Sequence, residues 1–187
     1  MKIFVFQVQE GFEWVLPADE GDFELFRALD GGSQAATWKP IQMRMVTEDE
    51  HGRPFQPSDM PWLGWHAPIL GERASAALAP VLLRDGELLP LACADAVLAV
   101  LNVTTVIDAL DLDRSVVARF PSSGRIMNVE SHVFRPERLQ GVQAFKVPEL
   151  LRGPVFVNEG VVASARGAGL VGVGFRQVWD GSLPAER

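Results

Sequence analysis

The sequence is poor in the residues that usually build metal sites and nucleophilic centres. It has one cysteine, Cys93, and three histidines, His51, His66 and His132. A single cysteine cannot form an intramolecular disulfide, and in the apolar run LLPLACADAVLAVL it is typical of a small buried hydrophobe. No HxxxH, HxH, CxxC or GxSxG motif occurs. We therefore expect no metal ion, no cofactor and no catalytic residue.

Basic residues are also scarce. The chain has 17 Lys and Arg against 24 Asp and Glu, which gives a formal net charge of −7. Phosphate backbones are bound by clustered Lys and Arg, so this balance argues against nucleic acid as a partner. The acidic excess would suit a basic partner surface, but solubility alone also accounts for it.

Long hydrophobic runs are absent as well. The apolar stretch near the start, in MKIFVFQVQEGFEWV, ends after about six residues, which is short for a targeting segment. The longest apolar stretch, residues 88–101, contains Pro90 and Asp95 and falls short of the ~18 residues of a membrane span. We expect no membrane association and a cytoplasmic location, which the low cysteine content also favours.

The residues that are present predict a folded α+β protein. Hydrophobic residues make up 48% of the 187, enough for a core, and we expect residues 1–187 to form a single domain. Alternating apolar residues predict a mixed or mostly antiparallel sheet. The expected strands are residues 2–8, 38–46, 87–93, one beginning at residue 97, 115–120, 126–134, 143–148, 154–158 and 170–179.

A few short helices are expected to pack against this sheet. The spacing of apolar residues predicts a helix over 70–82, with a kink or an end near Pro80. A second helix should run from the capping residue Asn158 to about residue 168, with Gly169 closing it. Phe23, Phe26 and Leu29 favour a further short helix.

Three local interpretations are more specific. Residues 13–16 should pair with the first strand or continue it, and the strand that begins at residue 97 could turn helical toward 108–111. In the last strand, Val171, Val173, Phe175 and Trp179 should share one face. Residues 181–187 are expected to be a frayed tail.

The segment PSDMPWLGWHAPILGERA, residues 57–74, combines prolines, two tryptophans and a histidine. It could be an aromatic binding platform, or the tryptophans could plug the core where a loop meets a helix. An enzyme hypothesis would place a site near His66, Asp59 and Trp62, which requires a concave pocket that brings them together.

Five blocks follow one another over residues 57–179: SDMPWLGWHAPILGERA, GELLPL, LNVTTVIDALDLDRS, FRPERLQGVQAFKVP and GLVGVGFRQVW. In this order the chain resembles the bacterial immunity-protein family associated with polymorphic toxin systems. The first 50 residues match less well, mainly in WKP around Trp38. The resemblance implies a protein that neutralises a cognate toxin by non-covalent occlusion and that is not an enzyme.

A block shared by proteins that face different toxins cannot by itself set the choice of partner. We therefore assign Pro61, Trp62, Gly64 and Trp65 to the scaffold. Exposed acidic loops are the candidate contacts with a basic toxin surface, namely Glu48, Asp49 and Glu50, and secondly Asp19, Glu20 and Asp22. The toxin is expected to be encoded by a neighbouring gene, and the oligomeric state is left open. An adaptor or chaperone of a secretion system is the other binding hypothesis.

Overall fold

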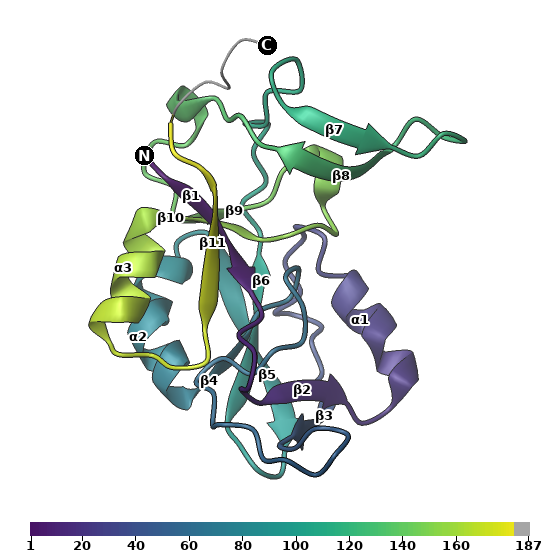
Figure 1. The fold of residues 1–187 in the computed structure, drawn as a ribbon, viewed down its shortest axis with the longest axis vertical. Helices are drawn as coiled ribbons and strands as arrows, with labels where there is room; N and C mark the ends of the chain where they lie inside the picture. The colour runs from purple at the N-terminus through teal and green to yellow at the C-terminus, as the bar shows by residue number, and fades with distance from the viewer. Residues whose placement is uncertain (182–187) are drawn as a thin grey trace.

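The described part of the chain forms two β-sheets, a separate hairpin and three α-helices (Figure 1). The computed structural model describes residues 1–181. One sheet is antiparallel, in the order β11-β1-β10-β9, and consists of β1 (Ile3–Gln7), β9 (Ala144–Phe145), β10 (Phe156–Asn158) and β11 (Gly174–Trp179).

The second sheet is mixed and has the order β2-β3-β5-β6-β4. Its strands are β2 (Trp14–Pro17), β3 (Gln42–Val46), β4 (Ile69–Gly71), β5 (Gly86–Cys93) and β6 (Leu98–Val103), and its parallel pair is β3 with β5. The antiparallel hairpin consists of β7 (Val116–Arg119) and β8 (Ile126–Ser131). The helices are α1 (Phe23–Arg27), α2 (Glu72–Leu82) and α3 (Glu159–Gly167), with 3-10 turns at Glu20–Asp22, Pro136–Arg138 and Pro148–Leu150.

This architecture confirms the predicted α+β class with a mixed, mostly antiparallel sheet. Central strands bury both faces because successive side chains point to opposite sides. In β6, Leu98 and Val100 enter the core beneath α1, whereas Leu101 and Val103 enter the core beneath α2 and α3. In β1, Ile3 and Val5 pack in a third cluster, and Phe6 packs under the helices. The near-continuous apolar sequence of both strands follows from this two-sided burial.

The two longer helices lie where their sequence patterns predict. The buried residues of α2 are Ala74, Leu78 and Leu82, one per turn along a single stripe. The helix ends at Leu82, just after Pro80, which has no N–H to donate. In α3, Asn158 caps the first turn by accepting from the N–H groups of Gly160 and Val161, and Gly169 adopts a φ of 62° after the last turn. Both helices pack against each other and cover one face of the sheets (Figure 1).

Two local predictions, one about strand pairing and one about a helix, were wrong. Residues 14–17 form β2, which pairs with β3 rather than with β1, and Val15 is buried against α1 and β3. Gly11, at a φ of 80°, lies in the turn that separates the two strands. Residues 108–111 are not helical, because their backbone groups bond to other segments: the N–H of Asp111 donates to Val133, and the carbonyl of Ala109 accepts from Arg135.

The prediction that Trp179 shares a face with Val173 and Phe175 was also wrong. The pairing of β1 with β11 shifts register between Ile3 and Phe4, so that Ile3 opposes Trp179 while Phe4 opposes Gln177. A bulge of this kind inserts one residue and reverses the side-chain alternation beyond it. Trp179 therefore packs against Ile3 and Phe134, while Phe175 packs under the helices.

Among the described residues, no helix combines the length and the hydropathy that crossing a membrane requires. The predicted frayed tail lies, from residue 182 onward, outside the described residues.

Candidate functional site

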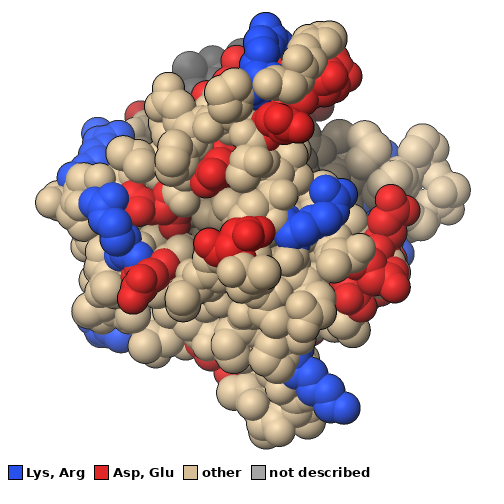
Figure 2. Space-filling model, turned by 90° about the horizontal axis from the view of Figure 1, so that it is seen from below, with Lys and Arg blue, Asp and Glu red and all other residues tan. Residues whose placement is uncertain are grey.

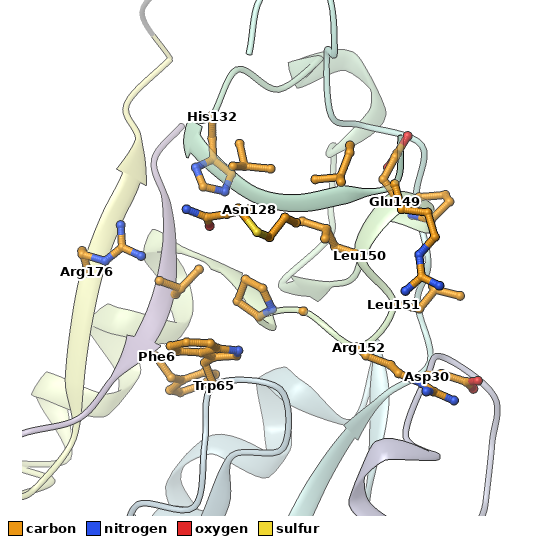
Figure 3. Close-up of a pocket in the computed structure, with 18 of the residues that line it drawn as sticks. Phe6, Asp30, Trp65, Asn128, His132, Glu149, Leu150, Leu151, Arg152 and Arg176 are labelled. Carbon is orange, nitrogen blue, oxygen red and sulfur yellow. The ribbon is translucent and has the colours of Figure 1, made fainter. Parts of the chain in front are cut away.

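A cleft of about 1150 Å³ lies between the β7–β8 hairpin and the body of the molecule (Figure 3). Strand β8 forms one wall and contributes Asn128, the largely buried His132 follows directly after the strand, and Trp65 lies on the opposite side. Much of the remaining lining comes from the end of β1, from residues 148–154, and from Arg176 of β11. The cleft is thus assembled from segments that are distant in the sequence.

The segment 61–66 reaches the cleft through backbone hydrogen bonds. Trp62 exchanges bonds with β2, donating to the carbonyl of Glu13 and accepting from the N–H of Val15, and its ring packs half-buried against the core under the helices. The carbonyl of Trp65 accepts from the N–H of Val155 at 3.0 Å. Its side chain, however, is 57% exposed and lines the cleft.

Trp65 therefore departs from the interpretation that both tryptophans plug the core. Pro61 is buried, and a Cβ added at Gly64 would lie 3.3 Å from Nδ1 of His66, so these two positions are tightly constrained. The scaffold role of Pro61, Trp62 and Gly64 stays a prediction.

Four arginines give the cleft its positive charge, against two carboxylates in its lining, Asp30 and Glu149. Arg119 and Arg125 belong to the hairpin, Arg152 to the 148–154 loop and Arg176 to β11. Burial, helped by the nearby charge of Arg176, lowers the pKa of His132 to about 4, so this imidazole is neutral at pH 7. One oxygen of Glu149, Oε2, is buried without a hydrogen-bond partner among the described residues.

A fully buried lysine supports the wall beside Asp30. Nζ of Lys146 donates to the carbonyls of Leu29 and Leu151 at 2.6 and 2.9 Å. Burial lowers the pKa of Lys146 to about 8, and the charge of Asp30 opposes that shift. Leu151 and Asp30 both line the cleft, so Lys146 ties two of its walls together.

The structure does not assemble the hypothetical enzyme site. Asp59 accepts from Arg73 and from the N–H of Val171, and it lines a different depression of about 630 Å³ that also contains Cys93. Trp62 lines the large cleft, and His66 lines neither. Burial, reinforced by the charges of Lys146 and Arg27, lowers the pKa of His66 to about 4. Its Nε2 is buried without a partner among residues 1–181.

The acidic candidates differ in how their carboxylates are used. Asp49 accepts from the N–H groups of His51 and Arg53 and pairs with the Arg53 side chain, and these hydrogen bonds keep its pKa below the usual value. Asp19 caps the 3-10 turn by accepting from Gly21, and Asp22 is half-buried. Glu48, Glu50 and Glu20 are exposed.

None of the six acidic candidates lines the cleft. Figure 2 views the end of the molecule at which β2 and β3 lie, and there the acidic side chains form separate groups with basic side chains between them. This end presents no continuous acidic face.

The cleft arginines were not predicted from the sequence. They are spread from residue 119 to residue 176, and each looks like an ordinary surface arginine in its own segment. The one available signal was Arg119 and Arg125 on either side of the turn PSSG, where a hairpin brings them close in space.

The chain is thus an α+β protein with a large, arginine-lined cleft, and among residues 1–181 no group of three or more His, Cys, Asp or Glu is placed to hold a metal ion. Residues 100–180 match the immunity protein family Imm11. This match confirms the resemblance to an immunity-protein family over that segment, whereas the block at residues 57–74 lies outside it. No curated protein matches the chain.

Proposed function

We propose that this chain is an immunity protein that binds a cognate toxin and neutralises it by non-covalent occlusion, without catalysis. The observation that carries the proposal is the family match over residues 100–180. The matched segment runs from β6 to the end of β11 and includes the hairpin, the 148–154 loop and Arg176. It therefore supplies most of the cleft, whose volume exceeds that of the depression around Asp59 and Cys93.

The proposed partner is the toxin of a polymorphic toxin system used in competition between bacteria, encoded by a gene next to this one. The immunity protein would act in the cytoplasm of the cell that it protects. Of the six acidic candidates, we propose that Glu48, Glu50 and Glu20 contribute to encounter, because their carboxylates extend into solvent. The carboxylates of Asp49 and Asp19 already accept hydrogen bonds from backbone N–H groups of their own loops. Charges at the rim of an interface mainly affect the association rate.

Growth of cells that express the neighbouring toxin tests the proposal. Cells that also express this chain should grow as well as cells without toxin, and an unrelated acidic protein of similar size should give no protection. The toxin should co-purify with this chain in a stable complex.

Killing despite equal expression of this chain would contradict the immunity function. A stable complex without protection would instead favour the adaptor or chaperone hypothesis. The growth readout therefore separates the two binding functions.

A further inference from the structure

The cleft has a charge opposite to that of the chain as a whole. The chain has a formal net charge of −7, yet four arginines line the cleft against Asp30 and Glu149. The one histidine of the lining, His132, does not alter this balance, because it is neutral at pH 7. A concave surface of one sign concentrates its field and attracts groups of the opposite sign.

The four arginines are available to a partner. All four are exposed, and within the described chain none of them forms an ion pair with a carboxylate. Arg119 donates to the carbonyl of Gly124 and so also supports the hairpin turn. By contrast, Arg53 and Arg73 each hold a carboxylate of their own chain. A guanidinium group that has no ion pair within its own chain can bind a carboxylate of another molecule through two parallel hydrogen bonds.

The cleft also exposes large apolar side chains between these charges. Trp65 is 57% exposed and Met127 is 54% exposed, and both line the cleft. Trp65 lies between Arg176 on one side and Arg152 on the other (Figure 3). Tryptophan, methionine and arginine are among the side chains that are enriched in protein interfaces.

We propose that the cleft receives an acidic segment of the toxin, with an apolar side chain of that segment seated on Trp65. This inference rests on the proposed function and assigns the contact to a surface different from the acidic loops. Arg152 and Arg176 lie at opposite sides of a cavity of about 1150 Å³ rather than converging on one point, which fits carboxylates spaced along a chain better than a single small anion. Charge complementarity and the exposed tryptophan together define the occupant.

The decisive experiment compares two pairs of arginines. The cleft variant is Arg125→Glu with Arg152→Glu, which leaves Arg119 to hold the hairpin turn. The control variant is Arg84→Glu with Arg166→Glu, which makes the same charge change at exposed residues outside the cleft. Affinity for the neighbouring toxin is measured by titration calorimetry, and the melting temperature verifies that each variant is folded.

The cleft variant should bind the toxin about 100-fold more weakly, whereas the control should stay within about 3-fold of the unchanged chain. Trp65→Ala should weaken binding by about 10-fold or more. Because its side chain is exposed, Trp65→Ala should leave the melting temperature nearly unchanged, which separates a contact from a folding defect.

The other outcomes overturn the inference in distinguishable ways. If the toxin binds the cleft and control variants equally, the cleft is not the contact, while the immunity function stands. If the unchanged chain does not bind the toxin at all, the proposed function fails and the inference fails with it. If the unchanged chain dimerises in solution and the cleft variant does not, the occupant is a second copy of the chain.

Discussion

Lys146 is the clearest case of one side chain under constraint. Its ammonium is removed from solvent and bonded to the carbonyls of Leu29 and Leu151. Because burial lowers its pKa from 10.5 to about 8, the unfolded chain binds more protons than the folded chain between these two values. The free energy of unfolding must therefore rise as the pH increases from 8 toward 10.5, as the cost of burying the charge disappears.

Lys146→Met should abolish this rise. Between pH 8 and 10, the gain in the free energy of unfolding should be smaller in the variant by about 2–3 kcal/mol, since one pKa unit corresponds to about 1.4 kcal/mol. Urea unfolding at several pH values measures it. The chain contains no tyrosine, which leaves few other groups to titrate in this range. Equal slopes in the two proteins would show that Lys146 is not titrating as a buried cation.

The burial of His132 should make the stability of the fold sensitive to acid. Its ring packs against Phe134 and Phe156, and burial together with the charge of Arg176 lowers its pKa from 6.5 to about 4. On acidification the unfolded chain is protonated first, so stability is lost as the pH falls from 6.5 to 4. His132→Phe should reduce this loss by about 3 kcal/mol.

The matched control is His51→Phe. The side chain of His51 is exposed beside Glu50, so this substitution should leave the acid dependence of stability unchanged. Thermal melts between pH 4 and 7 provide the comparison. His66, which is buried in the same way, remains in both variants, so part of the acid dependence should persist. A His132→Phe variant as acid-sensitive as the unchanged chain would contradict the assignment.

Among the secondary-structure elements, Asp59 and Arg73 join the two ends of the proline- and tryptophan-rich segment. Asp59 precedes Pro61, and Arg73 lies in the first turn of α2. Their ion pair has a length of 3.0 Å, and the same carboxylate accepts from the N–H of Val171 just before β11. One side chain thus connects the loop, the helix and the last strand, which explains the aspartate and the arginine of this block structurally.

Asp59→Ala should lower the free energy of unfolding by about 2 kcal/mol, because the N–H of Val171 and the guanidinium of Arg73 lose the carboxylate to which both donate. Glu50→Ala, at a carboxylate that extends into solvent, should change it by about 0.5 kcal/mol or less. Chemical unfolding of both variants tests this. Equal effects would mean that Asp59 does not hold these elements together.

The elements that could be predicted are those that are determined by residues close together in the sequence. The stripe Ala74, Leu78 and Leu82 and the cap Asn158 fix α2 and α3 from a few neighbouring residues. The partner of β2 was not predictable, because strand pairing depends on long-range contacts such as those of Val15 with α1 and β3. The face of Trp179 depends on a bulge that no local pattern reveals.

For the entire protein, the net negative charge could be predicted from the composition, but the distribution of charge over the surface could not. From the sequence we predicted partner contacts on the acidic loops, because runs of charged residues are visible in a linear chain. The arginine-lined cleft exists only after β7, β8, β11 and the 148–154 loop meet, so its positive charge emerges from topology. The organisation of residues 1–187 as a single domain stays a prediction.

The most direct test of the account is a titration of the purified toxin with the purified chain, with the activity of the toxin as the readout. Activity should fall in proportion to the amount of chain added and reach background at one chain per toxin. After the complex is separated in denaturant and the toxin is refolded, its mass should be unchanged and its activity restored. Inactivation by far less than one equivalent, a permanent change in the mass of the toxin, or full activity in excess chain would contradict neutralisation by non-covalent occlusion.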